Sequence, residues 1–484
     1  MVVGFGGAGA AAAITAADLG ADVVIVEKQP REQHTPSTRL SGGRIMTVND
    51  AAKATRYLDA CAQGMVPVAV SAAWAHKATR LIPWMEEVVT GLRLHRVGGC
   101  EHLELEGAES IDVVGQSTAK EGDLGFVVGE SDAATAAGPA LFAVLKAAVE
   151  RRPNIRIRWN QPATRLLRRD GARVSGVEVR DHSGSRRVDA GRAVILTSGG
   201  YEHDQVLKQN YLRAPSIYFY SNPGNTGDGV RMAQAVGADL WHMNQMIGRG
   251  VGHFELSDGR WKNFLLHLNP PGYVLLDKNG LRFANEYPQA MMKHGFYHEL
   301  VGYDAEEKVY PRIPCYWFFD QRRIRAAPLT PLTSGEVGIG LLNWSPDNQK
   351  EVERGWIKAA DTIEEVARLA GVADPKAAAR SIDEYNNACA TGLDRFGRPS
   401  DSLVPLDRPP YYCVPLYPGG SNTTGGPRRN EHAQIVDVFG DPIPGLYGAG
   451  ELGQATGLLC PSNGCNLSDC LSFGQIASES ALSH

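Results

Sequence analysis

The pattern of apolar and polar positions at the start of the chain predicts a strand, a helix and a second strand. Val2 and Val3 end a short apolar run, residues 8–19 form an alanine-rich segment closed by Gly20, and residues 21–28 are again strand-like. Further short apolar strands are predicted near residue 195 and on both sides of residue 440, before a final helix from about residue 467. The two ends of the chain therefore predict one Rossmann-type α/β domain.

The middle of the chain follows a different pattern. A helix is predicted at residues 139–150, and residues 174–179 and 186–189 are predicted to form a hairpin that turns at residues 182–185. After about residue 235 the alternation of strands and helices stops, and a long segment rich in Pro, Tyr, Trp and Phe follows.

Two helices are expected within that segment. Thr362 and Glu365 fit a capping box at the start of the first, and residues 375–390 predict the second. An α+β domain inserted into the Rossmann-type domain is the simplest interpretation.

A glycine-rich turn between the first strand and the helix has the spacing of a dinucleotide site. Residues 4–9 have the pattern G-x-G-x-x-G. Gly4 is expected to make the tight turn, Gly6 to let the backbone approach a pyrophosphate, and Gly9 to let helix and strand pack closely. The helix N-terminus would then face the phosphate charge. Glu27 ends the second strand at the spacing of a carboxylate that accepts hydrogen bonds from ribose hydroxyls.

Two later segments favour FAD over NAD as the nucleotide. One predicted strand ends at Ser198, Gly199 and Gly200, and the last one ends at Gly450 and Glu451. A chain that returns to the nucleotide from its far end suits a long ligand whose flavin is held hundreds of residues from the adenosine. No second G-x-G-x-x-G lies between a strand and a helix, so a built-in nicotinamide site is not predicted.

Composition limits the other classes of function. A chain of 484 residues predicts two domains, and 43% hydrophobic with 21% charged residues is typical of a globular protein. The net charge of -5, without a basic stripe or a zinc-finger or RNP pattern, argues against nucleic acid as a partner. No apolar run approaches the ~20 residues of a membrane span.

The cysteines and the first residues predict a location in the cell. The eight cysteines contain no C-x-x-C pattern, which fits reduced thiols in a large intracellular enzyme. Gly4 already begins the glycine turn, so a signal peptide is not predicted and a cytoplasmic location is expected. Because the first strand is short for its type, either the recorded sequence omits a few residues or the sheet edge is frayed, and we favour the former.

These segments resemble the fumarate reductase and 3-ketosteroid dehydrogenase superfamily of FAD flavoproteins, over essentially the whole chain. The other matching segments are Ser41-Gly42-Gly43 and residues 225–229, 282–286, 319–321, 424–426 and 464–469. The resemblance implies a Rossmann-type FAD-binding domain in two parts, residues 1–245 and 423–484. An α+β cap (substrate) domain, residues 246–422, is inserted between them, and the flavin lies at their interface.

The resemblance also implies which residues bind FAD. They are Gly4, Gly6, Gly7, Ala8, Gly9, Glu27, Lys28, Ser41, Gly42, Gly43, Ser198, Gly199, Gly200, Asp228, Gly450, Glu451, Asn466 and Leu467. The FAD is expected to be non-covalent, because relatives with a histidyl linkage carry that histidine closer to the Gly-Gly pair than His34 is.

Fumarate reductases, by this resemblance, hold two carboxylates and protonate carbon with an arginine. The matching positions here are Ala290 for that arginine, Pro461 for a second arginine and Asn422 for a histidine, so fumarate reduction is not expected. Arg249 lies near the position of another substrate-binding histidine and could bind one carboxylate. The alternative is a salt-bridged surface arginine.

The 3-ketosteroid dehydrogenases oxidise a saturated carbon pair beside a ketone. Removal of the α-proton leaves an enolate, so hydrogen-bond donors must face the carbonyl oxygen while a base lies over the α-carbon. In that family a tyrosine and a glycine N–H polarise the ketone, and another tyrosine is the base. Gly464 matches the glycine, but Cys460 stands in place of the polarising tyrosine, and residues 101–130 contain no tyrosine.

Other side chains could compensate. The candidate tyrosines are Tyr316, Tyr411, Tyr412 and Tyr417, and the candidate histidines of the cap are His253, His294 and His298. Tyr412 is preferred because it precedes the loop that links cap and flavin domain, with Tyr316 next. A tyrosine needs its phenolate stabilised to act as a base near neutral pH, and each of these side chains could instead be structural.

The C-terminal cysteines do not predict a metal site. Cys460, Cys465 and Cys470 form C-x4-C-x4-C, whereas plant-type iron–sulfur binding uses C-x4-C-x2-C. If Cys465 and Cys470 share a helix, they point about 140° apart.

The sequence thus predicts an FAD-dependent dehydrogenase that introduces a C=C bond α,β to a carbonyl in a largely apolar, cyclic ketone. One alternative is an ene-reductase that reduces an activated C=C bond, and another is a non-catalytic electron-transfer flavoprotein. The expected partners are a small-molecule substrate and an electron acceptor or donor that the sequence does not identify.

Overall fold

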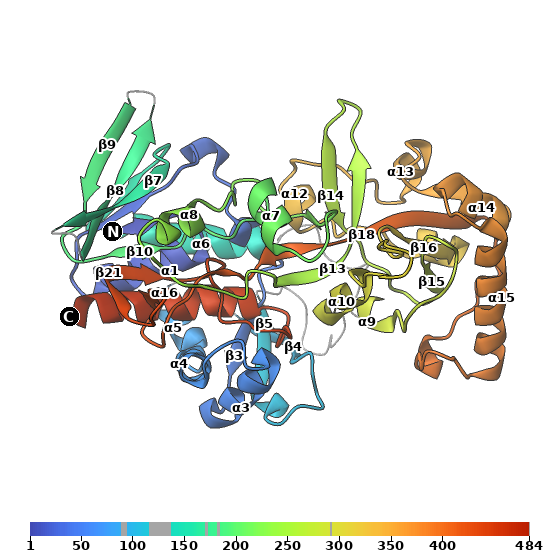
Figure 1. Ribbon diagram of the computed structural model, residues 1–484, viewed down its shortest axis with the longest axis horizontal. Helices are drawn as coiled ribbons and strands as arrows, with labels where there is room; N and C mark the ends of the chain where they lie inside the picture. The colour runs from blue at the N-terminus through green and yellow to red at the C-terminus, as the bar shows by residue number, and fades with distance from the viewer. Residues whose placement is uncertain (89–93, 116–136, 170–172, 182–183, 291–292, 484) are drawn as a thin grey trace.

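The computed structural model describes residues 1–88, 94–115, 137–169, 173–181, 184–290 and 293–483. Figure 1 shows two lobes: one holds both chain ends, and the other holds most of the segment between residues 246 and 423. The predicted hairpin turn at residues 182–185 lies partly outside the described residues.

A six-stranded sheet forms the centre of the first lobe, in the order β20-β21-β10-β1-β2-β6. Its strands are β1 (Val2–Val3), β2 (Val23–Val26), β6 (Ile155–Arg158), β10 (Val194–Leu196), β20 (Gln434–Val436) and β21 (Pro442–Gly448). All pairs are parallel except β20 with β21. The predicted strands at both ends of the chain therefore meet in one sheet, and the Rossmann-type prediction is confirmed.

Helices cover this sheet, and their small residues explain how closely they pack. Almost every residue of α1 (Gly7–Asp18) is buried, and it packs along the long C-terminal helix α16 (Cys465–Ser483). A Cβ at Gly474 would lie 2.7 Å from the Ala8 carbonyl oxygen, and the Ser478 hydroxyl donates to the Ala12 carbonyl at 2.7 Å. The alanine-rich start of the chain is thus a helix buried on nearly all sides.

A seven-stranded sheet forms the second lobe. Its main path is β14 (Trp261–Leu265), β13 (Met246–Glu255), β18 (Tyr411–Thr423), β16 (Cys315–Asp320) and β15 (Tyr273–Leu276). β11 (Tyr218–Phe219) and β17 (Lys358–Ala360) also pair with β18. Because β11 comes from the segment before residue 246, this sheet crosses the predicted domain boundary. The domain boundaries stay a prediction.

Smaller units complete the fold. The remaining strands are β3 (Ile45–Val48), β4 (His95–Gly99), β5 (Ile111–Gly115), β7 (Ala163–Arg169), β8 (Arg173–Asp181), β9 (Gly184–Asp189), β12 (Leu240–Trp241) and β19 (Gly426–Pro427). The remaining helices are α2 (Ser37–Leu40), α3 (Ala51–Ala62), α4 (Val68–Ala78), α5 (Leu81–Val88), α6 (Ala137–Glu150), α7 (Gln205–Tyr211), α8 (Asp228–Gln234), α9 (Tyr287–Ala290), α10 (Tyr297–Leu300), α11 (Gln321–Ala326), α12 (Gly335–Gly338), α13 (Gln349–Glu353), α14 (Ile363–Ala370) and α15 (Pro375–Thr391).

Local signals in the sequence match these elements. The Thr362 hydroxyl accepts a hydrogen bond from the Glu365 amide at 3.2 Å at the start of α14, and α15 begins at Pro375 as predicted. The predicted hairpin is β8 with β9, although β7, a third strand beside β8, was not predicted. Among the described residues, no helix combines the length and the apolar character that a bilayer crossing requires.

Candidate active site

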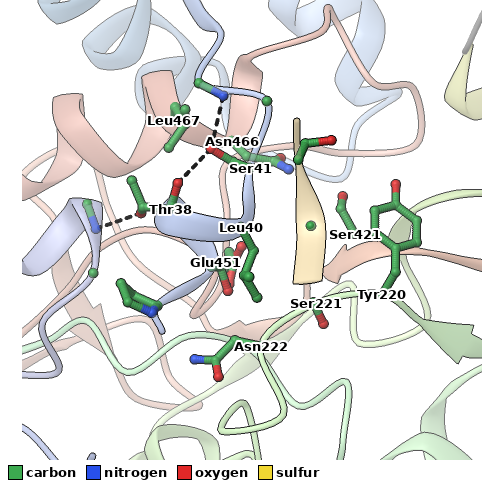
Figure 2. Close-up of a pocket in the computed structure, with 18 of the residues that line it drawn as sticks. Thr38, Leu40, Ser41, Tyr220, Ser221, Asn222, Ser421, Glu451, Asn466 and Leu467 are labelled. Carbon is green, nitrogen blue, oxygen red and sulfur yellow. Dashed lines mark hydrogen bonds between the residues drawn. The ribbon is translucent and has the colours of Figure 1, made fainter. Parts of the chain in front are cut away.

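The glycine turn lies where β1 meets α1 and opens onto a cavity of about 1020 Å³. The backbone of Gly6, Gly7 and Ala8 lines this cavity. Among the described residues, a Cβ at Gly6 would find no atom closer than 3.8 Å, so this face is open to a ligand. The Gly7 amide donates to the Thr38 hydroxyl at 2.8 Å, a bond drawn in Figure 2.

Close packing behind the turn requires glycine at its two ends. Gly4 has φ of +101°, and a Cβ there would lie 2.6 Å from the Thr197 carbonyl oxygen. A Cβ at Gly9 would lie 2.1 Å from the Gly4 carbonyl oxygen. These contacts agree with the tight-turn role expected of Gly4 and the helix–strand packing expected of Gly9.

Replacing Gly9 by alanine is expected to weaken FAD binding by roughly tenfold to a hundredfold, because overpacking of about 1–3 kcal/mol must push α1 away from the turn. Titration of the apoprotein with FAD, followed by flavin fluorescence, measures this. Gly191→Ala is the control, because a Cβ at Gly191 would have no neighbour within 4 Å in the part of the chain that the structure describes. Equal FAD affinities for the two variants would contradict the packing role of Gly9.

Glu27 lies at the same end of the cavity. Its two carboxylate oxygens accept hydrogen bonds from the Phe5 and Gln29 amides, each at 2.8 Å. Burial raises the pKa of Glu27, but hydrogen bonding from His34 and these amides outweighs burial and holds the pKa below its ordinary value. The side chain is therefore an ionised acceptor, as a ribose-binding carboxylate must be.

The residues predicted to bind FAD fall into two groups. Those that line the cavity are Gly4, Gly6, Gly7, Ala8, Glu27, Lys28, Ser41, Gly42, Gly43, Ser198, Gly199, Asp228, Glu451, Asn466 and Leu467. Gly9, Gly200 and Gly450 lie outside the lining, and a Cβ at any of them would meet another atom within about 3 Å. Figure 2 shows the Thr38 to Ser41 segment with Asn466 and Leu467 on one side of the cavity and Tyr220 with Ser421 across it.

Two carboxyl groups lie close together beside this cavity. Burial raises the pKa of Glu202 to about 7, and burial together with the Glu202 charge raises the pKa of Glu451 to about 8. Asn225 donates to Glu451 at 3.0 Å, and Thr423 donates to Glu202 through its amide at 2.7 Å and its hydroxyl at 3.0 Å. The pair therefore retains a proton near neutral pH, so one carboxyl group can donate a hydrogen bond to a ligand oxygen.

These features fit a long dinucleotide. The open face at Gly6 and the first turn of α1 suit a pyrophosphate, and Glu27 suits a ribose. The Ser198 hydroxyl and His34 Nδ1 are buried at the cavity wall with no protein partner in the described residues, and each can hydrogen-bond a ligand.

The far end of the cavity carries two arginines. Arg249 on β13 is 4% exposed, and Arg44 follows directly after Ser41-Gly42-Gly43. Burial and the positive charge of Arg249 lower the pKa of Arg44 to about 10. Burial, Arg249, Arg323 and Arg44 lower the pKa of His267 to about 3, so this imidazole is neutral. Glu101 offsets part of the Arg249 charge, but both arginines line the cavity and together can attract an anionic ligand.

Arg249 is held by a buried chain of side chains. Its Nη2 contacts His294 Nε2, and His294 Nδ1 lies 2.6 Å from a Glu101 carboxylate oxygen. Because arginine has only donors, His294 Nε2 must accept from Arg249 and Nδ1–H must donate to Glu101. Burial alone would raise the pKa of Glu101. The interactions with His294 and Arg249 outweigh burial and lower the pKa of Glu101. The chain therefore fixes the position of a charged Arg249.

This tautomer also bears on metal binding. Ligand atoms of Glu101, His294 and Cys460 lie within 4.8 Å of one another. A metal ion held through the ring nitrogen that faces Glu101 would need the lone pair of His294 Nδ1, and Nε2 would then carry the proton that faces the Arg249 donor. The arrangement of these four residues thus favours the hydrogen-bonded chain over a metal centre.

Tyr220 is a further polar group of this end, and sequence reasoning missed it. It follows β11, lines the cavity and lies beside Ser421 of β18 (Figure 2). Burial raises the pKa of Tyr220, while Arg249 and a hydrogen bond with Ser421 act in the opposite direction. A phenol next to a fixed cation can exchange a proton with a ligand.

The four residues predicted to take part in catalysis lie in two different environments. Arg249 and Gly464 line the cavity. Gly464 has φ of +100°, and a Cβ there would lie 2.9 Å from the Arg44 backbone. Tyr412 packs in an aromatic core, where it stacks on Phe319, and the Tyr316 hydroxyl donates to the Gly371 carbonyl at 3.1 Å.

Neither Tyr412 nor Tyr316 lines the cavity, so the structure gives them no access to a ligand there. The reason is that cores cover both faces of β18 and β16 in this region. Among the candidate histidines, His294 lines the cavity, whereas His253 stacks between Tyr218 and Trp261 outside it. Tyr411, Tyr417 and His298 are also outside the lining.

A protein-family model described as an FAD binding domain matches residues 1–467 of the chain. The predicted resemblance to the fumarate reductase and 3-ketosteroid dehydrogenase superfamily is confirmed. The crystal structure of 3-ketosteroid Δ1-dehydrogenase from Sterolibacterium denitrificans aligns with a TM-score of 0.84 at 23% identity. The alignment covers 100% of this chain and 99% of that one. The predicted fold, a Rossmann-type FAD-binding domain with a cap, is therefore confirmed.

Two curated relatives show the range of the family. Digoxin reductase of Eggerthella lenta is 26% identical over 525 residues, covering 99% of this chain and 85% of that protein. The 4-oxocyclohexanecarboxylate 2-dehydrogenase of Sinomonas cyclohexanicum is 28% identical over 337 residues, covering 64% of this chain and 54% of that protein, so the match spans about half of that relative. The chain belongs to the FAD-binding-domain family and is, at this level, an FAD-dependent oxidoreductase that acts on CH–CH bonds.

Proposed function

We propose that the protein is a dehydrogenase that introduces a C=C bond next to the carbonyl of a cyclic ketone, and that this ketone carries a carboxylate. The observation that supports the carboxylate is the pair of arginines at the far end of the cavity, Arg44 and Arg249. The proposal keeps the reaction expected from the sequence and replaces a largely apolar substrate by an anionic one.

Electrostatics support the anionic group. Arg249 is buried and fixed through His294, so a carboxylate would meet a preorganised donor. Placed between Arg44 and Arg249, it would relieve their mutual repulsion. The name of one relative, 4-oxocyclohexanecarboxylate 2-dehydrogenase, describes a substrate with both a ring ketone and a carboxylate.

The chemistry divides between cofactor and protein. Bound FAD supplies a two-electron acceptor for a hydride. The residues that would bind FAD or support its site are Gly4, Gly6, Gly7, Ala8, Gly9, Glu27, Lys28, Ser41, Gly42, Gly43, Ser198, Gly199, Gly200, Asp228, Gly450, Glu451, Asn466 and Leu467. His34 stacks on Phe5 with ring centroids 5.4 Å apart, beside Glu27 at the proposed ribose end, which supports non-covalent FAD.

Tyr220 is the proposed proton-transfer residue. Its phenolate would take the α-proton of the ketone, and the neighbouring Arg249 charge would stabilise that phenolate. The Gly464 amide, in the position of the family's glycine, would donate a hydrogen bond to the carbonyl oxygen as negative charge develops. The buried walls around Arg249 exclude water from these steps.

A second candidate is the reverse reaction, an ene-reductase supplied with electrons by a separate donor. The observation that favours it is the raised pKa of Tyr220, because a phenol that stays protonated at neutral pH can protonate carbon. The name of the relative digoxin reductase agrees with this direction. We also propose a cytoplasmic location, supported by eight cysteines that are all free thiols.

Anaerobic mixing of the FAD-loaded protein with candidate substrates tests the proposal. 4-Oxocyclohexanecarboxylate is expected to bleach the absorbance of the oxidised flavin in a single turnover. The neutral 4-oxocyclohexanecarboxamide is expected to do so at least tenfold less efficiently, because it cannot pair with Arg44 and Arg249. No electron acceptor is needed for this measurement.

The other outcomes separate the alternatives. Reoxidation of the reduced flavin by the matching enone acids, without bleaching by the saturated ketones, would establish the reductase. Equal rates with the carboxylate and the carboxamide would contradict the anionic substrate while leaving the dehydrogenase in place. No spectral change with either panel would favour a non-catalytic electron-transfer flavoprotein.

A further inference from the structure

Two buried thiols face each other at the wall of the active-site cavity. The sulfur atoms of Cys460 and Cys465 are 3.4 Å apart, and both residues line the cavity. An S–S bond is about 2.05 Å long, so the sulfur atoms would have to approach by roughly 1.4 Å to form one. The two residues are five positions apart in the segment that leads into α16, which limits the movement needed.

The surroundings of the two thiols differ in a way that suits stepwise oxidation. Cys465 is the first residue of α16, a helix of 19 residues, and lines the cavity from which an oxidant would arrive. Burial, Cys465 and Glu101 raise the pKa of Cys460 well above its ordinary value, so Cys460 stays a thiol. Cys465 is therefore the nucleophile, and Cys460 is placed to react second.

The loop that carries the pair touches both supports of the proposed anion site. Cys460 lies within 4.8 Å of Glu101 and His294, which hold Arg249. Gly464 packs against the Arg44 backbone. A bond between the two sulfur atoms would change contacts at both places at once.

We propose that Cys460 and Cys465 are an oxidisable dithiol that closes reversibly to a disulfide when a peroxide enters the cavity. The Cys465 sulfur attacks one peroxide oxygen, the O–O bond breaks, and the products are a sulfenic acid and an alcohol or water, which takes up the Cys465 proton. The Cys460 sulfur then attacks the sulfenic sulfur, the S–O bond breaks, and water leaves with the Cys460 proton. Two thiols and one peroxide thus give one disulfide, one alcohol or water, and one further water. An external dithiol reverses the reaction by exchange.

This inference is independent of the proposed substrate, since it rests on the thiols alone. It is tested on the FAD-loaded protein with hydrogen peroxide as the oxidant, followed by alkylation of the remaining thiols and cleavage after glutamate. The peptide of residues 452–479 contains Cys460, Cys465 and Cys470. In the oxidised protein it is expected to lose two hydrogens and to carry one alkylated cysteine, Cys470, and dithiothreitol is expected to restore three alkylated cysteines.

Matched variants assign the roles. Cys470→Ala is expected to keep the internal cross-link, because that sulfur takes no part in it. Cys460→Ser is expected to accumulate a sulfenic acid at Cys465 that dimedone traps, and Cys465→Ser to give neither the cross-link nor trapping at Cys460. Flavin absorbance and circular dichroism report whether each variant is folded.

Three results would overturn the proposal. One is a wild-type peptide with three alkylated cysteines after peroxide treatment of the folded protein. Another is oxidation of Cys465 to a sulfinic acid without a cross-link, and the third is a bond from either sulfur to Cys470.

Discussion

Arg249→Met is expected to lower kcat/KM for a ketone carboxylate by about two to three orders of magnitude. Removing one partner of a buried, hydrogen-bonded charge pair costs about 2–5 kcal/mol, and each 1.36 kcal/mol is a factor of ten in rate. The decrease in kcat/KM for the matching carboxamide is expected to be about tenfold smaller. With this neutral compound the substitution removes only the interaction of Arg249 with Tyr220. Single-turnover bleaching of the flavin with each compound measures both values.

Arg325→Met is the control for this variant. Arg325 also lines the cavity, but its side chain is exposed, so its charge is screened by solvent. Its removal is expected to change the rate by less than about threefold. Equal losses for carboxylate and carboxamide in Arg249→Met would show that Arg249 does not bind the anionic group.

Tyr220→Phe is the second variant with a large expected effect. It removes one hydroxyl group and is expected to lower the rate of flavin reduction by roughly 10²–10⁴, the usual contribution of a positioned acid or base. FAD binding is expected to stay unchanged, because the ring remains in place beside Ser421. Rapid mixing under anaerobic conditions gives the rate, and the flavin spectrum gives the FAD content.

Tyr412→Phe and Tyr316→Phe are the matched controls. Both hydroxyls lie outside the cavity, so the rate of flavin reduction is expected to stay within about twofold to threefold of wild type. A loss of 10² or more in either variant, with Tyr220→Phe active, would return the proton transfer to the tyrosines favoured by sequence alone.

The pH dependence follows from the raised pKa of Tyr220. As a base, Tyr220 must lose its proton, so the rate of dehydrogenation is expected to rise with pH up to the pKa of the phenol. In the reductive direction the protonated phenol is required, so the rate is expected to be level through neutral pH and to fall above that pKa. Tyr220→Phe is expected to lose the pH dependence of the rate in both directions. A wild-type rate of dehydrogenation that falls between pH 7 and 9 would argue against Tyr220 as the base.

The two kinds of tyrosine show why sequence reasoning favoured side chains that lie outside the cavity. Tyr412 and Tyr316 lie on strands near the centre of the second sheet, and the apolar side chains of the cap cover both faces of those strands. Tyr220 lies just past a two-residue strand that pairs with the far end of β18, where the sheet reaches the cavity. Strand order and the covered faces decide this difference, and neither is visible in one sequence.

The arginine site depends on tertiary structure in the same way. Arg44, Glu101, Arg249 and His294 come from four separate segments, and only the packing of both lobes brings them together. The sequence did indicate Arg249 and His294 singly, and Arg44 directly follows a segment already matched to the family. It could not show that Arg249 is buried rather than on the surface, because burial depends on what packs against β13.

The sequence by itself determined the features whose physical cause is local. The glycine turn, the alanine-rich helix, the short buried strands and the helix caps each follow from steric and hydrogen-bonding needs within a few residues, and together they identified an FAD-binding domain built from both chain ends. Only the tertiary structure decided which polar side chains share the substrate end of the cavity. That choice depends on sheet order, on which strand faces are covered, and on electrostatic contacts between segments about 205 residues apart, such as Arg44 and Arg249.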